Sequence, residues 1–142
     1  MTPNIYTVSR LTREIKTVLE NSFPRLWVEG EISNFKRHSS GHLYFTLKDE
    51  QSQISCAMWK YRAGSLLFRP ESGMKALVEG DVQVYERGGN YQLIVQQIQP
   101  AGIGALQIAF EQLKKKLHAE GLFDSHHKHP IPAFPQTVGV IT

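Results

Sequence analysis

The feature that most constrains the fold is a hydrophobic period of two that runs from Leu26 to Pro100. In four successive runs, small or apolar residues alternate with polar or aromatic ones. Such alternation is typical of β-strands that bury one face and expose the other. A fifth run, Tyr91 to Ile98, mixes both faces. The residues predicted to face inward in the first four runs are Val28, Gly30, Ile32, Leu43, Phe45, Leu47, Ile54, Cys56, Met58, Val78, Val82 and Val84.

Short polar and glycine-containing segments separate these runs and predict turns. The segment from Tyr61 to Pro70 is longer and contains three large apolar residues, which predict a helical turn that closes one barrel end. Five short strands with an insert between the third and fourth match an OB-fold, a small Greek-key barrel. An SH3-like barrel is the nearest alternative, but it does not usually carry such an insert there. We therefore expect a mainly β fold built on a five-stranded OB-fold Greek-key barrel.

A helix is predicted over Tyr6 to Phe23. Its apolar residues recur at the spacing of one helical face. Ser9 is the expected N-cap because its hydroxyl can accept from a free backbone N–H of the first turn. Pro24 cannot continue the helix and ends it. The apolar stripe consists of Leu11, Ile15, Val18 and Leu19.

A second helix is predicted after Pro100, with Gly121 as the natural residue just beyond its end. The three lysines at 114–116 fall in its last turns, where cations offset the negative end of a helix. The apolar stripe of this C-terminal helix consists of Leu106, Ala109, Phe110, Leu113 and Leu117.

The C-terminal segment is predicted to be a linker followed by a strand. Residues 126–135 contain three prolines, and Val138 to Thr142 is an apolar, β-branched run typical of a buried parallel strand. A strand of this type needs a sheet to join, so we expect the chain to lead into a further, truncated domain. The expected organisation is an N-terminal helix packed on the barrel (1–24), the barrel (25–101), a helix and linker (102–135), and that first strand (136–142).

Composition and charge narrow the class of protein. The net charge of +3 and pI of about 9.1 are only weak evidence for a nucleic-acid partner, because duplex-coating proteins often carry far more charge. No apolar run approaches the ~20 residues that cross a bilayer, so no membrane partner is expected. The single cysteine, Cys56, cannot form an internal disulfide, which fits a cytoplasmic location. We interpret Cys56 as a small buried hydrophobe.

An OB-fold binds oligonucleotides on its second and third strands, between the loops that follow the first and fourth. Tyr44 and Trp59 are expected to point outward from these strands, with Phe35 at the end of the first, and aromatic side chains stack on bases. The loop after the first strand joins two cations to small, flexible residues, which suits closure over a phosphate backbone. The predicted nucleic-acid-binding residues are Phe35, Lys36, Arg37, His42, Tyr44, Lys48, Trp59, Lys60 and Arg87.

Each of these residues also has a structural interpretation. Outward aromatic residues can cover the flanking helices, and Tyr85 and Tyr91 can pair across a hairpin. The Gly-Gly pair between them is first of all a turn. The coincidence of an aromatic face with two basic loops nevertheless favours binding.

No catalytic constellation is visible in this chain. It has neither a Gly-rich phosphate loop ending in Gly-Lys-Ser/Thr nor a Gly-x-Ser-x-Gly elbow. His126, His127 and His129 lie in a proline-flanked linker without a neighbouring cysteine, so we expect no specific metal site there. The sequence therefore predicts no catalytic residue, metal or cofactor.

Six stretches of the sequence are specific enough to carry a resemblance: Tyr6–Leu11, Trp27–Phe35, Ser40–Asp49, Gln99–Gly102, Glu120–Asp124 and Val138–Thr142. Together they resemble the N-terminal part of exodeoxyribonuclease VII large subunits, over nearly the whole chain. The resemblance implies an OB-type domain that presents single-stranded DNA to a C-terminal catalytic nuclease domain, truncated here, of which residues 136–142 would be the first strand. It also implies a parent enzyme that degrades single strands from either end into short oligonucleotides, with a small subunit that contacts C-terminal helices of the large one.

Two other functions remain compatible with the barrel pattern. One is an anticodon-type, RNA-binding OB domain, although a parallel strand after the linker argues against it. The other is an assembly domain whose outer aromatic residues form a protein interface and bind no nucleic acid.

Overall fold

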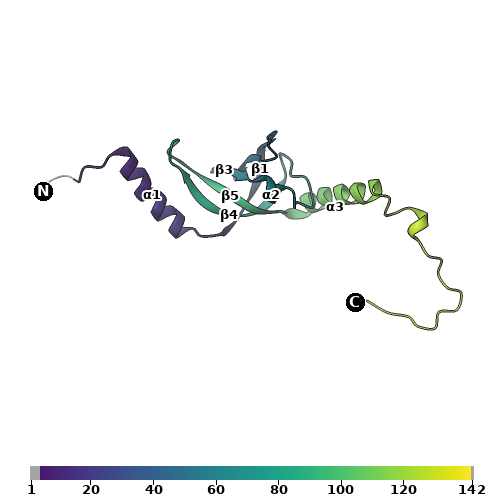
Figure 1. The fold of residues 1–142 in the computed structure, drawn as a ribbon. Coiled ribbons are helices and arrows are strands. Elements are labelled where there is room, and N and C mark those ends of the chain that lie inside the picture. The colour runs from purple at the N-terminus through teal and green to yellow at the C-terminus, as the bar shows by residue number, and fades with distance from the viewer. Residues whose placement is uncertain (1–3, 142) are drawn as a thin grey trace.

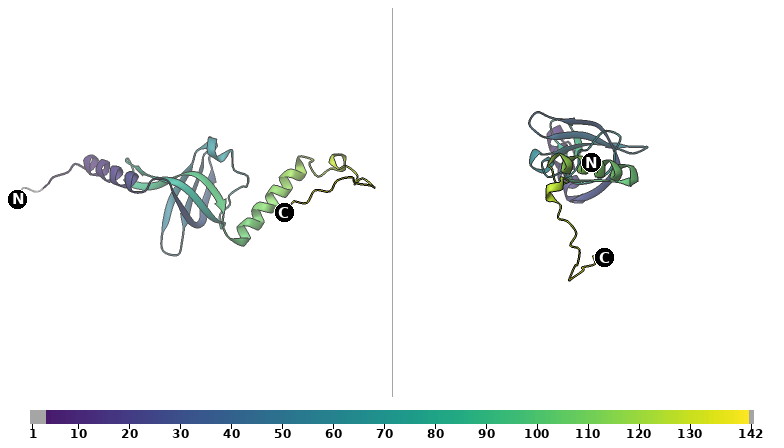
Figure 2. Two further views of the ribbon diagram at one scale, coloured as in Figure 1. Left: turned by 90° about the horizontal axis from the view of Figure 1, so that it is seen from below. Right: turned by 90° about the vertical axis from the view of Figure 1, so that its right-hand side faces the viewer.

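The computed structural model describes residues 4–141. A β-barrel lies at its centre, with helix α1 (Val8–Ser22) on one side and helix α3 (Gly102–Ala119) on the other (Figures 1 and 2). The two ends of the chain therefore extend from opposite sides of the barrel.

Five strands form the closed barrel in the order β1-β2-β3-β5-β4. Strand β1 pairs with β4 through its first half and with β2 through its second half, which closes the sheet on itself. Strands β3 and β5 are parallel, and every other pair is antiparallel. This order confirms the predicted OB-fold. The strands are β1 (Leu26–Arg37), β2 (Leu43–Lys48), β3 (Gln53–Met58), β4 (Lys75–Tyr85) and β5 (Asn90–Pro100).

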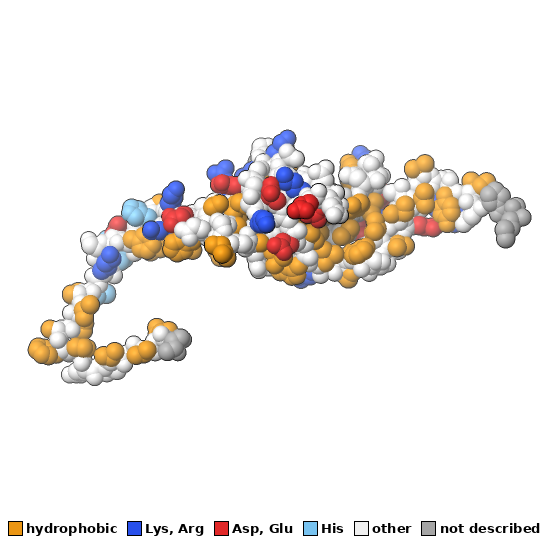
Figure 3. Space-filling model, turned by 180° about the vertical axis from the view of Figure 1, so that it is seen from behind, with side chains coloured by type: hydrophobic (Ala, Val, Ile, Leu, Met, Phe, Trp, Pro, Cys, Tyr) orange, Lys and Arg blue, Asp and Glu red, His pale blue; other side chains and the backbone are white. Residues whose placement is uncertain are grey.

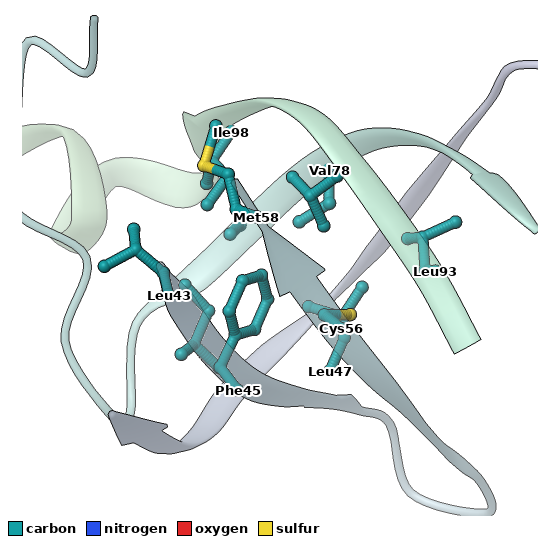
Figure 4. Close-up of a cluster of buried hydrophobic side chains, with 11 residues drawn as sticks. Leu43, Phe45, Leu47, Cys56, Met58, Val78, Leu93 and Ile98 are labelled. Atoms are coloured by element: carbon teal, nitrogen blue, oxygen red, sulfur yellow. The ribbon is translucent and has the colours of Figure 1, made fainter. Parts of the chain in front are cut away.

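The barrel interior is a continuous apolar core, and Figure 4 shows side chains from β2, β3, β4 and β5 meeting there. Full burial of an aliphatic or aromatic side chain contributes roughly 1.5–3 kcal/mol, so this cluster is the main source of stability. Strand β2 alternates strictly, because its odd-numbered residues are buried and its even-numbered ones are not. The predicted phase of alternation is therefore confirmed there. The largest fully buried side chains are Ile32, Met58, Val78, Leu93 and Val95.

Two glycines allow the strands to approach closely where the barrel closes. A Cβ added at Gly30 would lie 2.8 Å from Cγ of Leu47. A Cβ added at Gly80 would lie only 2.6 Å from the carbonyl oxygen of Ile94, beside an irregularity in the β4–β5 pairing. A side chain at either position would push the paired strands apart.

The segment between β3 and β4 partly fulfils its predicted role at the end of the barrel. It begins with the short helix α2 (Lys60–Ala63), and two of its apolar residues, Leu66 and Phe68, pack against the core. The third, Leu67, is 77% exposed.

Helix α1 contacts the barrel mainly through strand β4 and the hairpin that follows it. Nζ of Lys16 lies 2.8 Å from Oε1 of Glu86, and the backbone N–H of Val84 donates to Glu20 at 3.4 Å. The N-cap is Thr7, whose hydroxyl accepts from the backbone N–H of Arg10, so the prediction of Ser9 was wrong by two residues. No residue of α1 is buried, and its apolar stripe is largely exposed.

The C-terminal helix has its predicted position, and Gly121 adopts the left-handed conformation (φ +74°) typical of a residue just beyond a helix end. A single 3₁₀ turn, η1 (Ser125–His127), follows. Residues 138–141 form no strand in this structure, and their pairing in a further domain stays a prediction. Figure 3 shows hydrophobic side chains along both α1 and α3 on the face it presents.

Candidate nucleic-acid interface

A β-bulge in β1 sets the chemistry of the candidate site. Between Ser33, which pairs with Thr46, and Lys36, which pairs with Tyr44, strand β1 contains one residue more than β2. Asn34 lies in this bulge with a positive φ of 50°, a conformation that Asn tolerates better than most residues. The bulge shifts the alternation by one residue, so Lys36 becomes the direct cross-strand neighbour of Tyr44.

The same shift turns Phe35 toward the barrel core, where its ring centroid lies 6.3 Å from that of Phe45. The expectation that Phe35 is an outward stacking surface was therefore wrong. Successive side chains of a strand point to opposite faces. Arg37 consequently points away from Lys36, into a groove that it lines with Phe35 and Leu43.

Tyr44 is 41% exposed on the outer face of β2, as the alternation predicts. His42 is two residues before Tyr44 and lies on the same face, and the two ring centroids are 6.5 Å apart in an edge-to-face arrangement. Trp59 completes the row with its ring 5.1 Å from that of His42, and His38 lies 6.3 Å from Tyr44 on the other side. These four rings, His38, His42, Tyr44 and Trp59, form what we call the aromatic cluster.

Trp59 differs from its predicted position. Strand β3 ends at Met58, and Trp59 is the extended residue that precedes helix α2. Its side chain is half-buried rather than fully exposed. It nevertheless falls on the outer face, because the pairing of Leu43 with Met58 places His42 and Trp59 next along the ladder.

Hydrogen bonds fix the tautomers of both histidines. The backbone N–H of Lys60 donates to Nδ1 of His42 at 3.0 Å, and the backbone N–H of Ser40 donates to Nδ1 of His38 at 3.2 Å. A backbone amide can only donate, so each Nδ1 is an acceptor and the ring proton of the neutral form is on Nε2. Each histidine therefore keeps one N–H donor for another acceptor, such as a phosphate oxygen or a base.

The loop after β1 is a tight turn and not the flexible loop that the sequence suggested. The backbone N–H of His38 donates to the carbonyl of His42, and that of Gly41 donates to His38, both at 2.9 Å. Gly41 has a φ of +88°, which favours glycine. Lys36 and Arg37 belong to β1 itself, so both cations are anchored on a strand.

The second predicted loop lies at the opposite end of β3 from Trp59. A shallow hollow crosses the sheet from Thr46 and Ser55 to Tyr91 and reaches the β4–β5 hairpin that carries Arg87. The sequence also allowed Tyr85 and Tyr91 to pair across this hairpin. Tyr85 pairs with Asn90 and Tyr91 pairs with Val84, so the two tyrosines are not directly opposite each other. Arg87 is exposed at the hairpin tip, away from the aromatic cluster.

The remaining predicted cations differ in their surroundings. Lys60 is the first residue of α2 and is exposed beside the aromatic cluster. Lys48 is at the other end of β2, where its Nζ lies 3.3 Å from Oε1 of Glu31. An ion-paired lysine among carboxylates is a weak candidate for a phosphate contact.

The described residues offer no alternative reactive centre. Burial raises the pKa of the Cys56 thiol to about 12, which keeps the thiol protonated and unreactive near neutral pH. Within residues 4–141 no group of three or more His, Cys, Asp or Glu side chains is placed to hold a metal ion. None of the described helices is long and apolar enough to cross a membrane.

Sequence reasoning missed His38 as a member of the aromatic cluster. His38 is not among the predicted binding residues, whereas the turn brings its ring against Tyr44. The available signal was the pair of histidines flanking the three-residue Ser-Ser-Gly segment, which places both rings at the same hairpin end.

A comparison with protein families agrees with the barrel fold. A family model described as an OB-fold nucleic acid binding domain matches residues 6–99. One chain of a replication protein A heterotrimer bound to ssDNA has a TM-score of 0.45 and 14% identity, over 66% of this chain and 72% of that one.

Curated relatives share much higher identity. The exodeoxyribonuclease 7 large subunit of Geobacter metallireducens is 54% identical over 97% of this chain and 30% of its own length. The protein of the same name from Bacillus subtilis is 51% identical over 96% of this chain and 31% of its own length. The resemblance inferred from the motifs is therefore confirmed. This chain spans about a third of the length of these relatives.

Proposed function

Because the chain belongs to the OB-fold nucleic-acid-binding domain family, we propose that it binds single-stranded DNA as a module of an exodeoxyribonuclease VII large subunit. The observation that carries this proposal is the aromatic cluster with Lys36 and Lys60 beside it. Stacking on an aromatic ring contributes ~1–3 kcal/mol per base and requires no particular sequence. Duplex DNA keeps its bases stacked on one another, so a surface of this kind favours single strands.

The cluster supports stacking because its rings are held in fixed positions. Tyr44 is on β2, which is paired with β1 and β3, and His42 is fixed by the hydrogen bond from Lys60. A preformed surface loses less side-chain entropy on binding than a flexible one does. Both histidine Nε2–H groups, and the two lysine ammonium groups, then supply donors for the phosphates of the same strand.

For the whole protein we propose hydrolysis of single-stranded DNA to short oligonucleotides, in the cytoplasm and in a complex with a small subunit. This rests on the identity with relatives that carry the name of the enzyme. Residues 136–142 are proposed to begin the nuclease domain, and 102–135 to connect it to the barrel. The present chain is proposed to have no nuclease activity, since no catalytic constellation lies within it.

The test is a binding comparison with the chain itself. Fluorescence anisotropy with labelled oligothymidylate, oligouridylate and duplex DNA, each at several salt concentrations, measures both preference and electrostatics. Tighter binding of the DNA single strand than of the duplex, with affinity that falls as salt rises, supports the proposal. Preference for the RNA strand supports the anticodon-type alternative, and absence of binding to all three supports an assembly role.

A further inference from the structure

A second basic surface lies outside the aromatic cluster, in a groove of about 530 Å³ between the end of the barrel and helix α3. Four cations line it: Arg37 from β1, Arg69 from the segment before β4, and Lys115 and Lys116 from α3. All four are exposed. None of them takes part in the ion pairs found within residues 4–141. Four cations against a single carboxylate, Glu71, attract a polyanion to this groove.

The side chain of Gln112 on α3 holds the groove in shape through hydrogen bonds to the backbone of Arg69. Gln112 of α3 accepts a hydrogen bond from the backbone N–H of Arg69 at 2.7 Å, and its amide donates back to the carbonyl of Arg69 at 3.2 Å. The same amide donates to Glu71, the one carboxylate among the residues that line the groove, at 3.4 Å. Helix α3 is thereby fixed to the barrel, with Lys115 and Lys116 one turn beyond the contact.

The groove and the aromatic cluster meet at the end of β1. The β1–β4 ladder stops at Glu31, so near Lys36 and Arg37 strand β1 pairs only with β2. These two neighbouring cations point to opposite faces of this two-stranded ribbon, one toward Tyr44 and the other into the groove. A phosphate backbone can therefore pass around the ribbon edge with a cation on each side.

We propose that the groove binds the phosphate backbone of the same single strand whose bases stack on the aromatic cluster, and so continues the binding path along α3. This rests on the proposed function. The occupant is a nucleic-acid strand because the groove offers several cations and few apolar anchors along its α3 wall. The sequence placed the three lysines at 114–116 where cations offset the negative end of the helix, and the structure places two of them in this groove as well.

The test compares oligothymidylates of two lengths: about 6 nucleotides, near the lower end of the site size of roughly 4–16 nucleotides for one OB-fold, and about 20 nucleotides, beyond its upper end. The groove variant is Lys115→Glu with Lys116→Glu. The matched control is Lys114→Glu with Lys128→Glu, two exposed lysines that do not line the groove. Both double variants change the net charge from +3 by four, to −1. Circular dichroism verifies that each is folded.

The expected result is a gain in affinity with length that the groove variant loses and the control keeps. For the long strand, the slope of log affinity against log salt should become shallower by about 1.4 in the groove variant, at about 0.7 for each lost phosphate contact. The short strand should bind both variants almost equally, because it is held by the aromatic cluster. Tyr44→Ala should weaken both lengths.

Two outcomes overturn the inference and can be told apart. If groove and control variants bind both lengths alike while the wild-type chain binds DNA, the groove has no role and the proposed function stands. If the wild-type chain binds neither length, the proposed function fails as well. A cross-link from a photoreactive thymidine in the long strand to α3, absent with the short one, provides independent support.

Discussion

The backbone N–H of Lys60 donates to Nδ1 of His42 at 3.0 Å and so connects the start of helix α2 to the turn before β2. Lys60 directly follows Trp59 in the chain, and the ring of Trp59 packs edge-to-face on the same His42 imidazole. The hydrogen bond between Lys60 and His42 therefore helps to hold the Trp59 ring in place, although Trp59 takes no part in that bond.

Replacing His42 with Ala should reduce both stability and DNA affinity, each by about 1 kcal/mol, or roughly fivefold in affinity. The cause is the loss of the acceptor for Lys60 and of the ring that supports Trp59. His42→Asn is the control, because its amide oxygen can replace Nδ1 as the acceptor. Urea unfolding and anisotropy measure the two effects, and equal behaviour of the Ala and Asn variants would contradict the role of the hydrogen bond.

Tyr44→Ala should weaken binding of single-stranded DNA by roughly 1–3 kcal/mol, whereas Tyr44→Phe should retain most of the affinity because the ring remains. The fold should survive, since Tyr44 is 41% exposed. Trp27→Ala is a matched control: Trp27 is 43% exposed but lies nine residues before Lys36, about 30 Å along the strand. Equal losses from Tyr44→Ala and Trp27→Ala would show that stacking is not localised at the aromatic cluster.

Lys36→Gln should make the salt dependence of DNA binding shallower by about 0.7 in log-log slope, which corresponds to one phosphate of a single strand. Lys48→Gln should change the slope much less, because Lys48 is paired with Glu31. Anisotropy titrations at several salt concentrations decide between them. A larger effect at Lys48 than at Lys36 would indicate that the bound DNA lies along the other end of β2.

Asp49 should make stability depend on pH at the acid end. Backbone N–H groups of Gln51 and Ser52 donate to its carboxylate at 2.8 and 2.7 Å, and they lower its pKa from the ordinary 3.8. The folded pKa lies below the unfolded one, so this stabilisation is present above about pH 4 and is lost as the pH falls through the folded value.

The comparison for this effect is Asp49→Asn, which keeps an acceptor oxygen but does not titrate. The stability advantage of wild type over this variant, measured by urea unfolding, should shrink between about pH 7 and about pH 3. An advantage that stays constant across this range would show that the carboxylate charge has no part in the turn.

Gly80→Ala should destabilise the barrel by about 2 kcal/mol, because the added methyl group meets the Ile94 carbonyl oxygen at 2.6 Å and the backbone cannot move aside cheaply. The control is Gly104→Ala in α3, where an added Cβ meets nothing within 4 Å. That change should be neutral or slightly stabilising, since alanine is the better helix former. Thermal unfolding of the two variants distinguishes steric conflict from a general effect of losing glycine.

The sequence predicted most of the barrel because the alternation is a local property of each strand. Hydrophobic residues at every second position fix which face is buried, and β2 shows the predicted phase at each of its six residues. Helix ends were less predictable, because Thr7 and Ser9 are both capable N-caps and only the backbone conformation selects Thr7.

The candidate site was predicted less completely, because it depends on relations between segments. The extra residue at Asn34 leaves no signature in the alternation, yet it turned Phe35 inward and separated Lys36 from Arg37. The ion pair of Lys48 with Glu31 depends on the β1–β2 register, which local patterns do not give. Tyr44 was placed correctly because its strand is regular.

The bulge at Asn34 separates the number of residues in β1 from the direction in which its last side chains point. Removing Asn34 would restore regular pairing and still leave Phe35 opposite Phe45 and Lys36 opposite Tyr44. Pairing Asn34 in the ladder would instead set Phe35 opposite Tyr44 and point Lys36 toward the core. The outer face therefore carries a cation at this point because one residue stays out of the ladder. Among related chains, a gap at this position is therefore compatible with the same surface chemistry.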